Sequence, residues 1–144
     1  MAVRNIVKLP SETLRRICRT QLNFDDRLHT MLDDMAETMH KADGVGLAAP
    51  QVGILRRVCV VDIGDGVIEL VNPVIVKESG KQTDSEGCLS IPGRYEMVIR
   101  AMNIIVKAQD RFGNNFELSA EGLKARAISH EVDHLNGILF IDKI

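Results

Sequence analysis

The stretch AISHEVDHLNG, residues 127–137, contains two histidines four positions apart, His130 and His134, with Glu131 directly after the first. On a helix this spacing places both imidazoles on one face, one turn apart. Such a pair can bind a metal ion, and the intervening glutamate is placed to handle a proton. The alternative is a pair of ordinary surface or core histidines. A single helix packed on sheets would bury this face, so the stretch favours a buried metal-binding helix.

The pattern around this stretch predicts an α+β fold. Residues 119–137 have helical character, with Ser119 as a possible cap and Asn136-Gly137 as the end. Two earlier segments, 10–19 and 23–44, also predict helices. Between them and the last helix lie short runs rich in Val and Ile, bounded by Gly, Pro and Asp: 56–64, 66–72, 73–80, 95–101, 103–110 and the end of 110–118. Runs of strands followed by one late helix predict mostly antiparallel sheets.

Length and composition favour one globular domain spanning residues 1–144. Hydrophobic residues make up 45% of the 144 residues, which excludes a disordered chain. The formal net charge is −2 and there is no long basic run, so we expect no direct nucleic-acid binding. No apolar stretch is long enough to span a membrane, and the N-terminus lacks the pattern of a signal peptide. These features predict a cytoplasmic protein.

The cysteines differ in their surroundings. Three widely spaced cysteines make a disulfide scaffold improbable and fit a reducing cytosol. Cys59 lies in an apolar strand-like run and Cys18 on a short helix, so we expect both to be packing residues. Cys88 lies in the tight segment DSEGCLSIPG, residues 84–93, where it could serve as a thiolate ligand or as a packed thiol.

The position of the third metal ligand distinguishes zinc proteases, in which it follows the two histidines, from enzymes in which it precedes them. One large group of zinc proteases has a third histidine six residues after the second, but Phe140 occupies that position here. Asp142 is the only later carboxylate in the chain, and no further helix fits after it. The third ligand should therefore come from upstream of the histidines, which favours Cys88.

A second unusual segment is GVGLAAPQVG, residues 44–53. Its small residues allow another backbone to approach closely, and Gln51 can donate a hydrogen bond. One interpretation is a tight turn between a helix and a strand. The other is a substrate-binding edge with an oxyanion donor at its end.

Together these segments resemble the peptide deformylase family. Its motifs, in order, are Gly-φ-Gly-φ-Ala-Ala-x-Gln, Glu-Gly-Cys-φ-Ser and Gln-His-Glu-φ-Asp-His, where φ is apolar. Residues 44–51 match the first and residues 86–90 match the second completely. Residues 130–134 match the third, except that Ser129 replaces the glutamine. The motifs span residues 44–134, and their order and spacing are more specific than any one of them.

The resemblance implies fold, activity and cofactor. The fold would be α+β, with mostly antiparallel sheets around a central C-terminal helix that carries the His-Glu-x-x-His motif. The chain would be a hydrolase that removes the N-formyl group from the initiator methionine of nascent polypeptides and releases formate. Cys88, His130 and His134 would bind one divalent metal, Fe(II) in the family, with zinc, nickel or cobalt as substitutes. Its partners would be N-formylmethionyl nascent peptides, with transient ribosome association and no membrane binding.

The resemblance also assigns roles to single residues. Glu131 would move the proton, while the Gln51 side chain and the backbone N–H of Leu89 would stabilise the oxyanion. The peptide would lie along Val45 and Gly46 and near Gly87, as in the family. The methionine pocket would be lined by Val45, Leu123 and Ala127. Arg126 stands where relatives often have an aliphatic residue, and we expect its stem to cover the pocket while its charge reaches water.

Two rival functions remain at this point. One is a small metalloprotease, which the missing histidine at position 140 and the upstream cysteine disfavour. The other is a non-catalytic, ribosome-associated module with a structural metal, but structural sites usually have four ligands and the sequence offers three strong candidates. A last expectation concerns Glu86, which should be partly buried and would then need a cationic partner. We predict a bidentate pair between Glu86 and Arg100.

Overall fold

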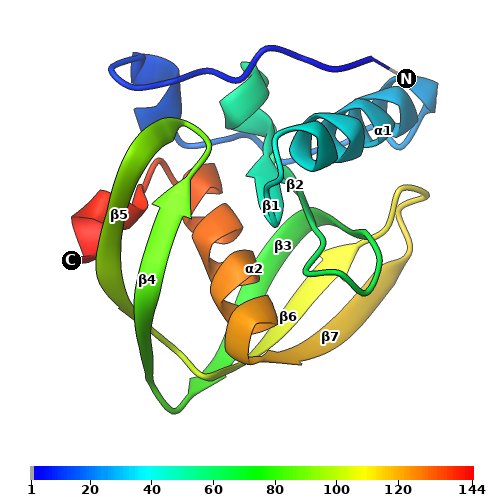
Figure 1. Cartoon of the computed structure of the whole chain (residues 1–144). Helices are drawn as coiled ribbons and strands as arrows, with labels where there is room; N and C mark the ends of the chain where they lie inside the picture. Colours follow the sequence, from blue (N-terminus) through cyan, green and yellow to red (C-terminus); the bar gives the residue numbers. More distant parts are fainter. Residues whose placement is uncertain (1) are drawn as a thin grey trace.

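The fold places one helix between two antiparallel sheets. The computed structural model describes residues 2–144. Helix α2, Gly122–Leu135, runs through the middle, with a five-stranded sheet on one side and a two-stranded hairpin on the other (Figure 1). The α+β prediction with a central C-terminal helix is therefore confirmed.

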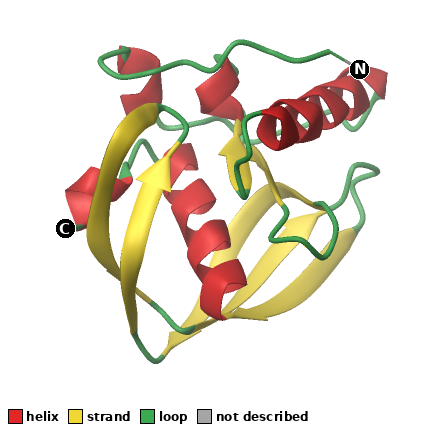
Figure 2. Cartoon of the chain, viewed as in Figure 1, coloured by secondary structure: helices red, strands yellow, loops and turns green. Residues whose placement is uncertain are grey.

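The larger sheet has the order β1-β2-β3-β6-β7, and all of its neighbouring strands are antiparallel. Figure 2 shows the sheet curving around α2. Its strands are β1 (Gly46–Ala48), β2 (Val58–Val61), β3 (Ile68–Ser79), β6 (Asn103–Gln109) and β7 (Asn115–Glu121).

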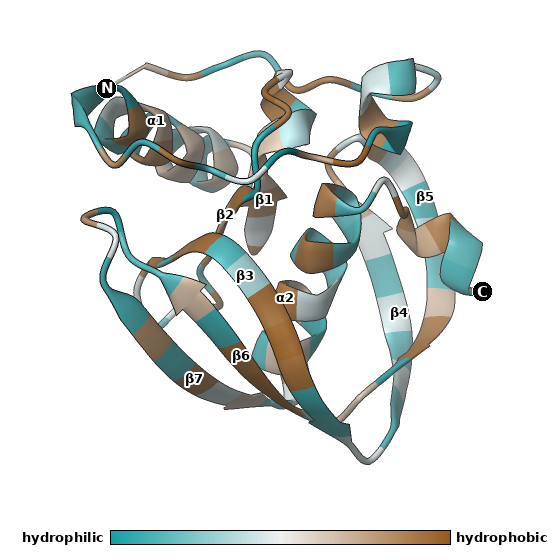
Figure 3. Ribbon diagram, turned by 180° about the vertical axis from the view of Figure 1, so that it is seen from behind, coloured by the Kyte–Doolittle hydropathy of each residue, from teal (hydrophilic) through white to brown (hydrophobic). Residues whose placement is uncertain are grey.

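Strand β3 corrects one expectation. Residues 66–72 and 73–80 do not form two strands, since a single strand runs through Pro73. The register shifts between Val71 and Val74, where β3 passes from its pairing with β2 to its pairing with β6. Proline lacks an N–H donor and is tolerated at such an irregularity. The apolar run that follows in β3 is visible from behind (Figure 3).

The smaller sheet consists of β4 (Gln82–Cys88) and β5 (Ile91–Arg100). The sequence pattern predicted the second half of β5 and treated residues 84–93 as a tight segment. The first half of that segment is strand, and the chain turns at Leu89 and Ser90. Strand β4 escaped prediction because its residues are mostly polar and only Glu86 is buried.

Helix α1, Asp26–Lys41, lies above the sheets (Figure 1). Asp25 caps it by accepting a hydrogen bond from the backbone N–H of Leu28. Short 3-10 helices cover Glu12–Arg15, Ala49–Val52 and Phe140–Lys143. The N-terminal segment that precedes the first 3-10 helix runs along α1, and the backbone N–H of Ala2 donates there to Asp34 at 2.7 Å.

Helix α2 begins later than predicted. Ser119 does not cap it, because residues 115–121 pair with β6 as strand β7. Glu121 is the N-cap, and Gly122 has a φ of 60°, which lets the chain turn from strand into helix.

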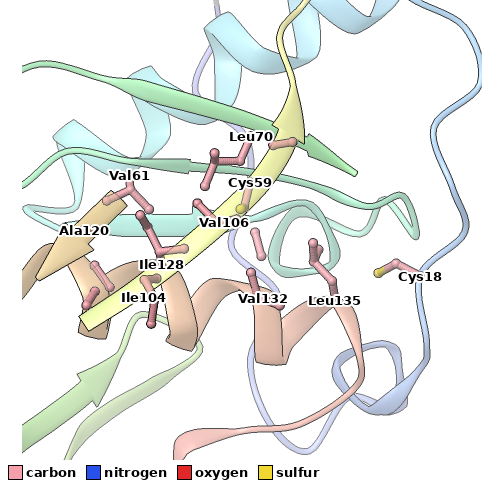
Figure 4. Packing of buried hydrophobic residues seen from close by; sticks show 14 residues of the cluster. Cys18, Cys59, Val61, Leu70, Ile104, Val106, Ala120, Ile128, Val132 and Leu135 are labelled. Carbon is pink, nitrogen blue, oxygen red and sulfur yellow. The ribbon is translucent and has the colours of Figure 1, made fainter. Parts of the chain in front are cut away.

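The main hydrophobic core lies between α2 and the larger sheet (Figure 4). Ile128, Val132 and Leu135 of α2 pack there against Cys59, Leu70 and the other strand residues. Cys18 and Cys59 are buried free thiols in this core, so their prediction as packing residues is confirmed. No helix among residues 2–144 is long and apolar enough to cross a membrane.

Candidate metal centre and active site

Three possible metal ligands converge on the side of α2 that faces the hairpin. One donor atom each from Cys88, His130 and His134 lies within 4.8 Å of the other two. The Cys88 Sγ is 3.3 Å from Nε2 of His134. Both histidines are buried and Cys88 is half-buried. The helix brings the histidines together through their four-residue spacing, and strand β4 supplies the cysteine from upstream, as the sequence indicated.

The end of β4 aims Cys88 at the helix. The register between β4 and β5 shifts between Glu86 and Cys88, so the ladder is irregular just before the thiol. Such irregularities bend a strand and redirect its side chains. Phe140, at the position of the third histidine in proteases, is instead a buried ring stacked on His130, with ring centroids 6.1 Å apart.

A buried carboxylate orients the first histidine. Glu86 Oε2 accepts a hydrogen bond from Nδ1 of His130 at 2.7 Å, which directs the other ring nitrogen toward the ligand cluster. Arg100 donates to both oxygens of Glu86, at 2.9 and 2.6 Å. The predicted bidentate pair of Glu86 and Arg100 is therefore confirmed. Arg100 also donates to Asp133 of α2 at 2.7 Å, so the arginine ties the hairpin to the helix.

The same contacts fix the charge of Glu86. Burial alone would raise the pKa of its carboxyl, but hydrogen bonds from Arg100 and His130 hold that pKa well below its usual range. For His134, burial is the main cause of a pKa well below that of an exposed histidine. A neutral imidazole is the form that binds metals.

Glu131 has an open carboxylate oxygen. Its side chain is buried, and its Oε1 has no hydrogen-bond partner within residues 2–144. Burial raises the pKa of Glu131 to about 7, where it can both accept and release a proton near neutrality. Gly46 packs against it, because a Cβ at Gly46 would lie 2.3 Å from Glu131 Oε2.

Gln51 presents a donor to the same place. The backbone N–H of Ala48 donates to its Oε1 at 2.9 Å, which fixes which end of the amide faces the site. Its Nε2 then points to Ser90 Oγ at 3.1 Å and to Cys88 Sγ at 3.6 Å. The segment 44–53 forms a tight connection (β1 and a 3-10 helix), and four of its residues also line the cavity beside the ligand cluster.

A cavity of about 400 Å³ connects these groups. His134 does not line this cavity. The other site residues expected from the sequence do line it: Val45, Gly46, Gln51, Gly87, Cys88, Leu89, Leu123, Ala127, His130 and Glu131. The sequence did not indicate Tyr95, which also lines the cavity. A Cβ at Gly87 would lie 2.7 Å from the Tyr95 ring, so this contact depends on a pairing between strands that no local pattern reveals.

Arg126 also lines the cavity but does not behave as expected. The prediction that its charge reaches water is wrong, because the residue is 4% exposed. Its guanidinium donates to Glu86 Oε1 at 2.8 Å and to the carbonyl of Val98 at 2.9 Å. A cation buried in this way needs hydrogen-bonded partners, and Glu86 and the Val98 carbonyl supply them.

Comparison with known proteins agrees with this geometry. The family model described as Polypeptide deformylase matches residues 3–144. A peptide deformylase of Caldicellulosiruptor bescii is 56% identical over 144 residues, covering 100% of this chain and 87% of that protein. Peptide deformylase 1 of Bacillus anthracis is 58% identical, covering 100% of this chain and 94% of that protein. The crystal structure of peptide deformylase from Thermotoga maritima superposes with a TM-score of 0.98 at 40% identity, covering 100% and 99% of the two chains. The chain belongs to the polypeptide deformylase family.

Proposed function

We propose that Cys88, His130 and His134 hold one divalent metal ion, Fe(II) in the native protein, and that deformylation takes place in the cavity beside them. As a member of the family, the chain is a hydrolase that removes the N-formyl group from the initiator methionine of nascent polypeptides. The observation that carries the residue assignment is the convergence of three ligand-type atoms within 4.8 Å, next to an open glutamate oxygen.

The donor set fits a divalent transition metal. One thiolate and two imidazoles suit iron, zinc, nickel and cobalt. The hydrogen bond from His130 Nδ1 to Glu86 leaves Nε2 of that ring to bind the metal. Three protein ligands leave a coordination position open, as catalytic sites require. The choice of Fe(II) follows from the family resemblance, with zinc, nickel or cobalt as substitutes.

The metal, when bound, lowers the pKa of water toward about 7 and polarises the formyl carbonyl. Glu131 accepts the proton of the attacking water through its open Oε1. The oxygen of that water adds to the formyl carbon. When the bond between the formyl carbon and the nitrogen breaks, Glu131 returns the proton to the departing amine. Formate and a free N-terminal methionine result, and Glu131 is left as it began.

Two donors stabilise the charge that develops on the formyl oxygen. One is Nε2 of Gln51, which Ala48 holds in a fixed orientation. The other is the backbone N–H of Leu89, the residue after Cys88 in the turn between β4 and β5. Donors that are already oriented stabilise a developing oxyanion without reorganisation.

The methionine side chain occupies the apolar part of the cavity. Val45, Leu123 and Ala127 line this part, and the peptide backbone lies extended between Gly46 and Gly87. Glycine at both positions leaves this edge without a side chain, and a Cβ at either would clash with Glu131 or Tyr95. Because formyl is the smallest acyl group, the room at the ligands admits it and excludes longer acyl chains.

Several wider properties follow from the same proposal. Residues 1–144 form one catalytic domain, which is supported by a family match over residues 3–144. The substrates are N-formylmethionyl nascent peptides, which the protein meets in the cytoplasm during transient association with the ribosome. The residue pattern gives no reason to expect a nucleic-acid or membrane partner.

The test is purification without oxygen, followed by metal analysis and assay on formyl-Met and acetyl-Met peptides. We expect about one divalent metal per chain, with formate released and no release of acetate. Cys88→Ala should lose the metal, whereas Cys18→Ala, at a buried thiol that does not line the cavity, should keep it. Full metal content in Cys88→Ala would refute the ligand assignment, and equal rates on both peptides would refute the acyl selectivity.

A further inference from the structure

Arg126 has an unusual environment for an arginine that lines a substrate cavity. Its side chain is 5% exposed and points into the protein beneath the hairpin. Besides Glu86 and the Val98 carbonyl, it reaches Gln82, with Nε 3.4 Å from Oε1 and Nη2 3.3 Å from the backbone carbonyl. These contacts join α2 to both strands of the hairpin. They hold the guanidinium in one orientation.

The contacts on Glu86 are divided between its two oxygens. Oε1 accepts from Arg126 at 2.8 Å and from Arg100 at 2.9 Å, while Oε2 accepts from Arg100 at 2.6 Å and from His130 at 2.7 Å. The two hydrogen bonds from Arg100 alone would hold the carboxylate but would still allow it to rotate relative to the guanidinium. The second arginine fixes Oε1, so Oε2 stays aimed at the histidine.

The charges explain why a second arginine is tolerated there. Glu86 and the half-buried Asp133 are the carboxylates around Arg100 and Arg126, so two negative charges balance the two guanidiniums. A buried charge is stable only when it is paired and hydrogen-bonded. Glu86 is therefore the partner that Arg126 needs; the aliphatic residue that relatives often have at this position would need none.

The other end of the side chain has a different role. With the guanidinium engaged, the hydrocarbon stem is the part of Arg126 left to face the cavity. Leu123 and Ala127, neighbours on the same helix, line the cavity beside it. The stem can supply the apolar wall that an aliphatic residue would supply, while the head supports the ligand cluster.

We propose that Arg126 is a positioning residue for the metal ligand His130, acting through Glu86. The inference rests on the proposed metal site but does not depend on the reaction that occurs there. Residues that orient a ligand in this way typically change metal affinity by about 10–100-fold when removed. In residues 2–144 no hydrogen bond joins Arg126 to Cys88, His130 or His134, whereas Glu86 bonds to both Arg126 and His130, so we assign the effect to this carboxylate.

The experiment compares zinc-loaded wild type with Arg126→Met, Arg126→Lys and a control, Arg27→Met. Methionine keeps an unbranched apolar stem, lysine keeps the charge without the fork, and Arg27 is an exposed arginine on α1. The rate of zinc transfer to a chelator measures metal retention. The exchange of the His130 Nδ1 proton with water, followed by NMR, reports the hydrogen bond to Glu86 without any assay of activity.

We expect Arg126→Met to release zinc about 10–100-fold faster than wild type and to exchange the His130 proton at least about fivefold faster. Arg27→Met should match wild type, and Arg126→Lys should lie between, since an ammonium cannot reproduce the planar fork. If Arg126→Met does not fold, the lysine variant decides. Wild-type behaviour of the folded variant in both measurements overturns the inference. A wild-type protein that binds no zinc refutes the metal site as well.

Discussion

Gly46→Ala should displace the carboxylate of Glu131, the proposed base, while leaving the fold intact. The added Cβ would lie 2.3 Å from Oε2 of Glu131, 2.9 Å from its Cδ and 3.0 Å from its Cγ, whereas ordinary contacts begin at 3.4 Å. The backbone on either side is fixed by pairing with β2, so the side chain must move. The carboxylate would have to shift by about 1 Å, and a displacement of about 1 Å can cost about 100-fold in rate.

The assay is steady-state hydrolysis of a formyl-Met peptide, with metal content and thermal unfolding measured on the same samples. We expect kcat to fall about 100-fold, with metal content and unfolding temperature close to wild type. A rise in KM alone would mean that Gly46 only gives room to the peptide backbone. Glu131→Asp provides the control, because its shorter side chain leaves space for the new Cβ.

Gly46→Ala should therefore cost much less in the Glu131→Asp background than in the wild type, as expected for residues in contact. The reasoning fails if Gly46→Ala turns over within threefold of wild type. It also fails if the two substitutions act independently, since the clash would then not be the cause of the loss.

The remaining predictions concern charged side chains. Glu131→Gln should keep the metal and lose deformylation, because an amide cannot accept the proton; turnover near the wild-type rate would exclude Glu131 as the base. Removing Glu86 or Arg100 alone should destabilise the protein by about 3–5 kcal/mol and weaken metal retention, because the other charge stays buried. In chemical denaturation the double variant should lose less than the sum, and simple additivity would contradict the coupling. Asp34→Asn should lower stability at neutral pH but not in strong acid. The backbone N–H of Ala2 is the main cause of a lowered Asp34 pKa, so the stabilisation exists above the unfolded-state value of about 3.9 and disappears as pH falls through the folded-state value. An equal loss of stability at both pH values would contradict this assignment.

The sequence predicted the arrangement of side chains correctly where that arrangement depends on local spacing. The histidine pair and Glu131 are four residues or fewer apart, so one helical turn determines their arrangement. Helix α1 also has a local signal, an acidic cap followed by a periodic apolar stripe. Cys88 was favoured as the third ligand because Phe140 occupies the position at which zinc proteases have their third histidine.

The sequence was less informative where a residue depends on a distant strand. Pro73 suggested a break, but the pairing of β3 with β2 on one side and β6 on the other carries the strand through it. The contact of Gly87 with Tyr95 follows from strand register. The direction of Arg126 depends on Glu86, forty residues earlier in the chain. A local pattern contains none of these partners.

Strand β4 could not be predicted from the sequence for the same physical reason that the candidate metal site lies beside it. One face of α2 is apolar and packs on the larger sheet through residues such as Ile128 and Val132 (Figure 4). Its opposite face is buried but polar, with Arg126, His130 and Glu131 among its members. The element that packs on this polar face must supply charged side chains rather than apolar ones, because an unpaired buried charge is strongly destabilising.

The hairpin meets this requirement with Glu86 and Arg100, and it gains little from alternating hydrophobic residues. Strand β4 therefore lacks the pattern by which strands are recognised, although its Glu86 and Cys88 both belong to the polar cluster beside α2. A buried ion network of this kind is often no more stable than an apolar core of the same volume. In the proposed metal centre, the role of this network is to keep His130 in the one orientation that faces the metal. Replacing the network with hydrocarbon should accordingly preserve or raise stability while lowering metal retention, and denaturation and chelator competition on one multiply substituted variant can separate these two effects.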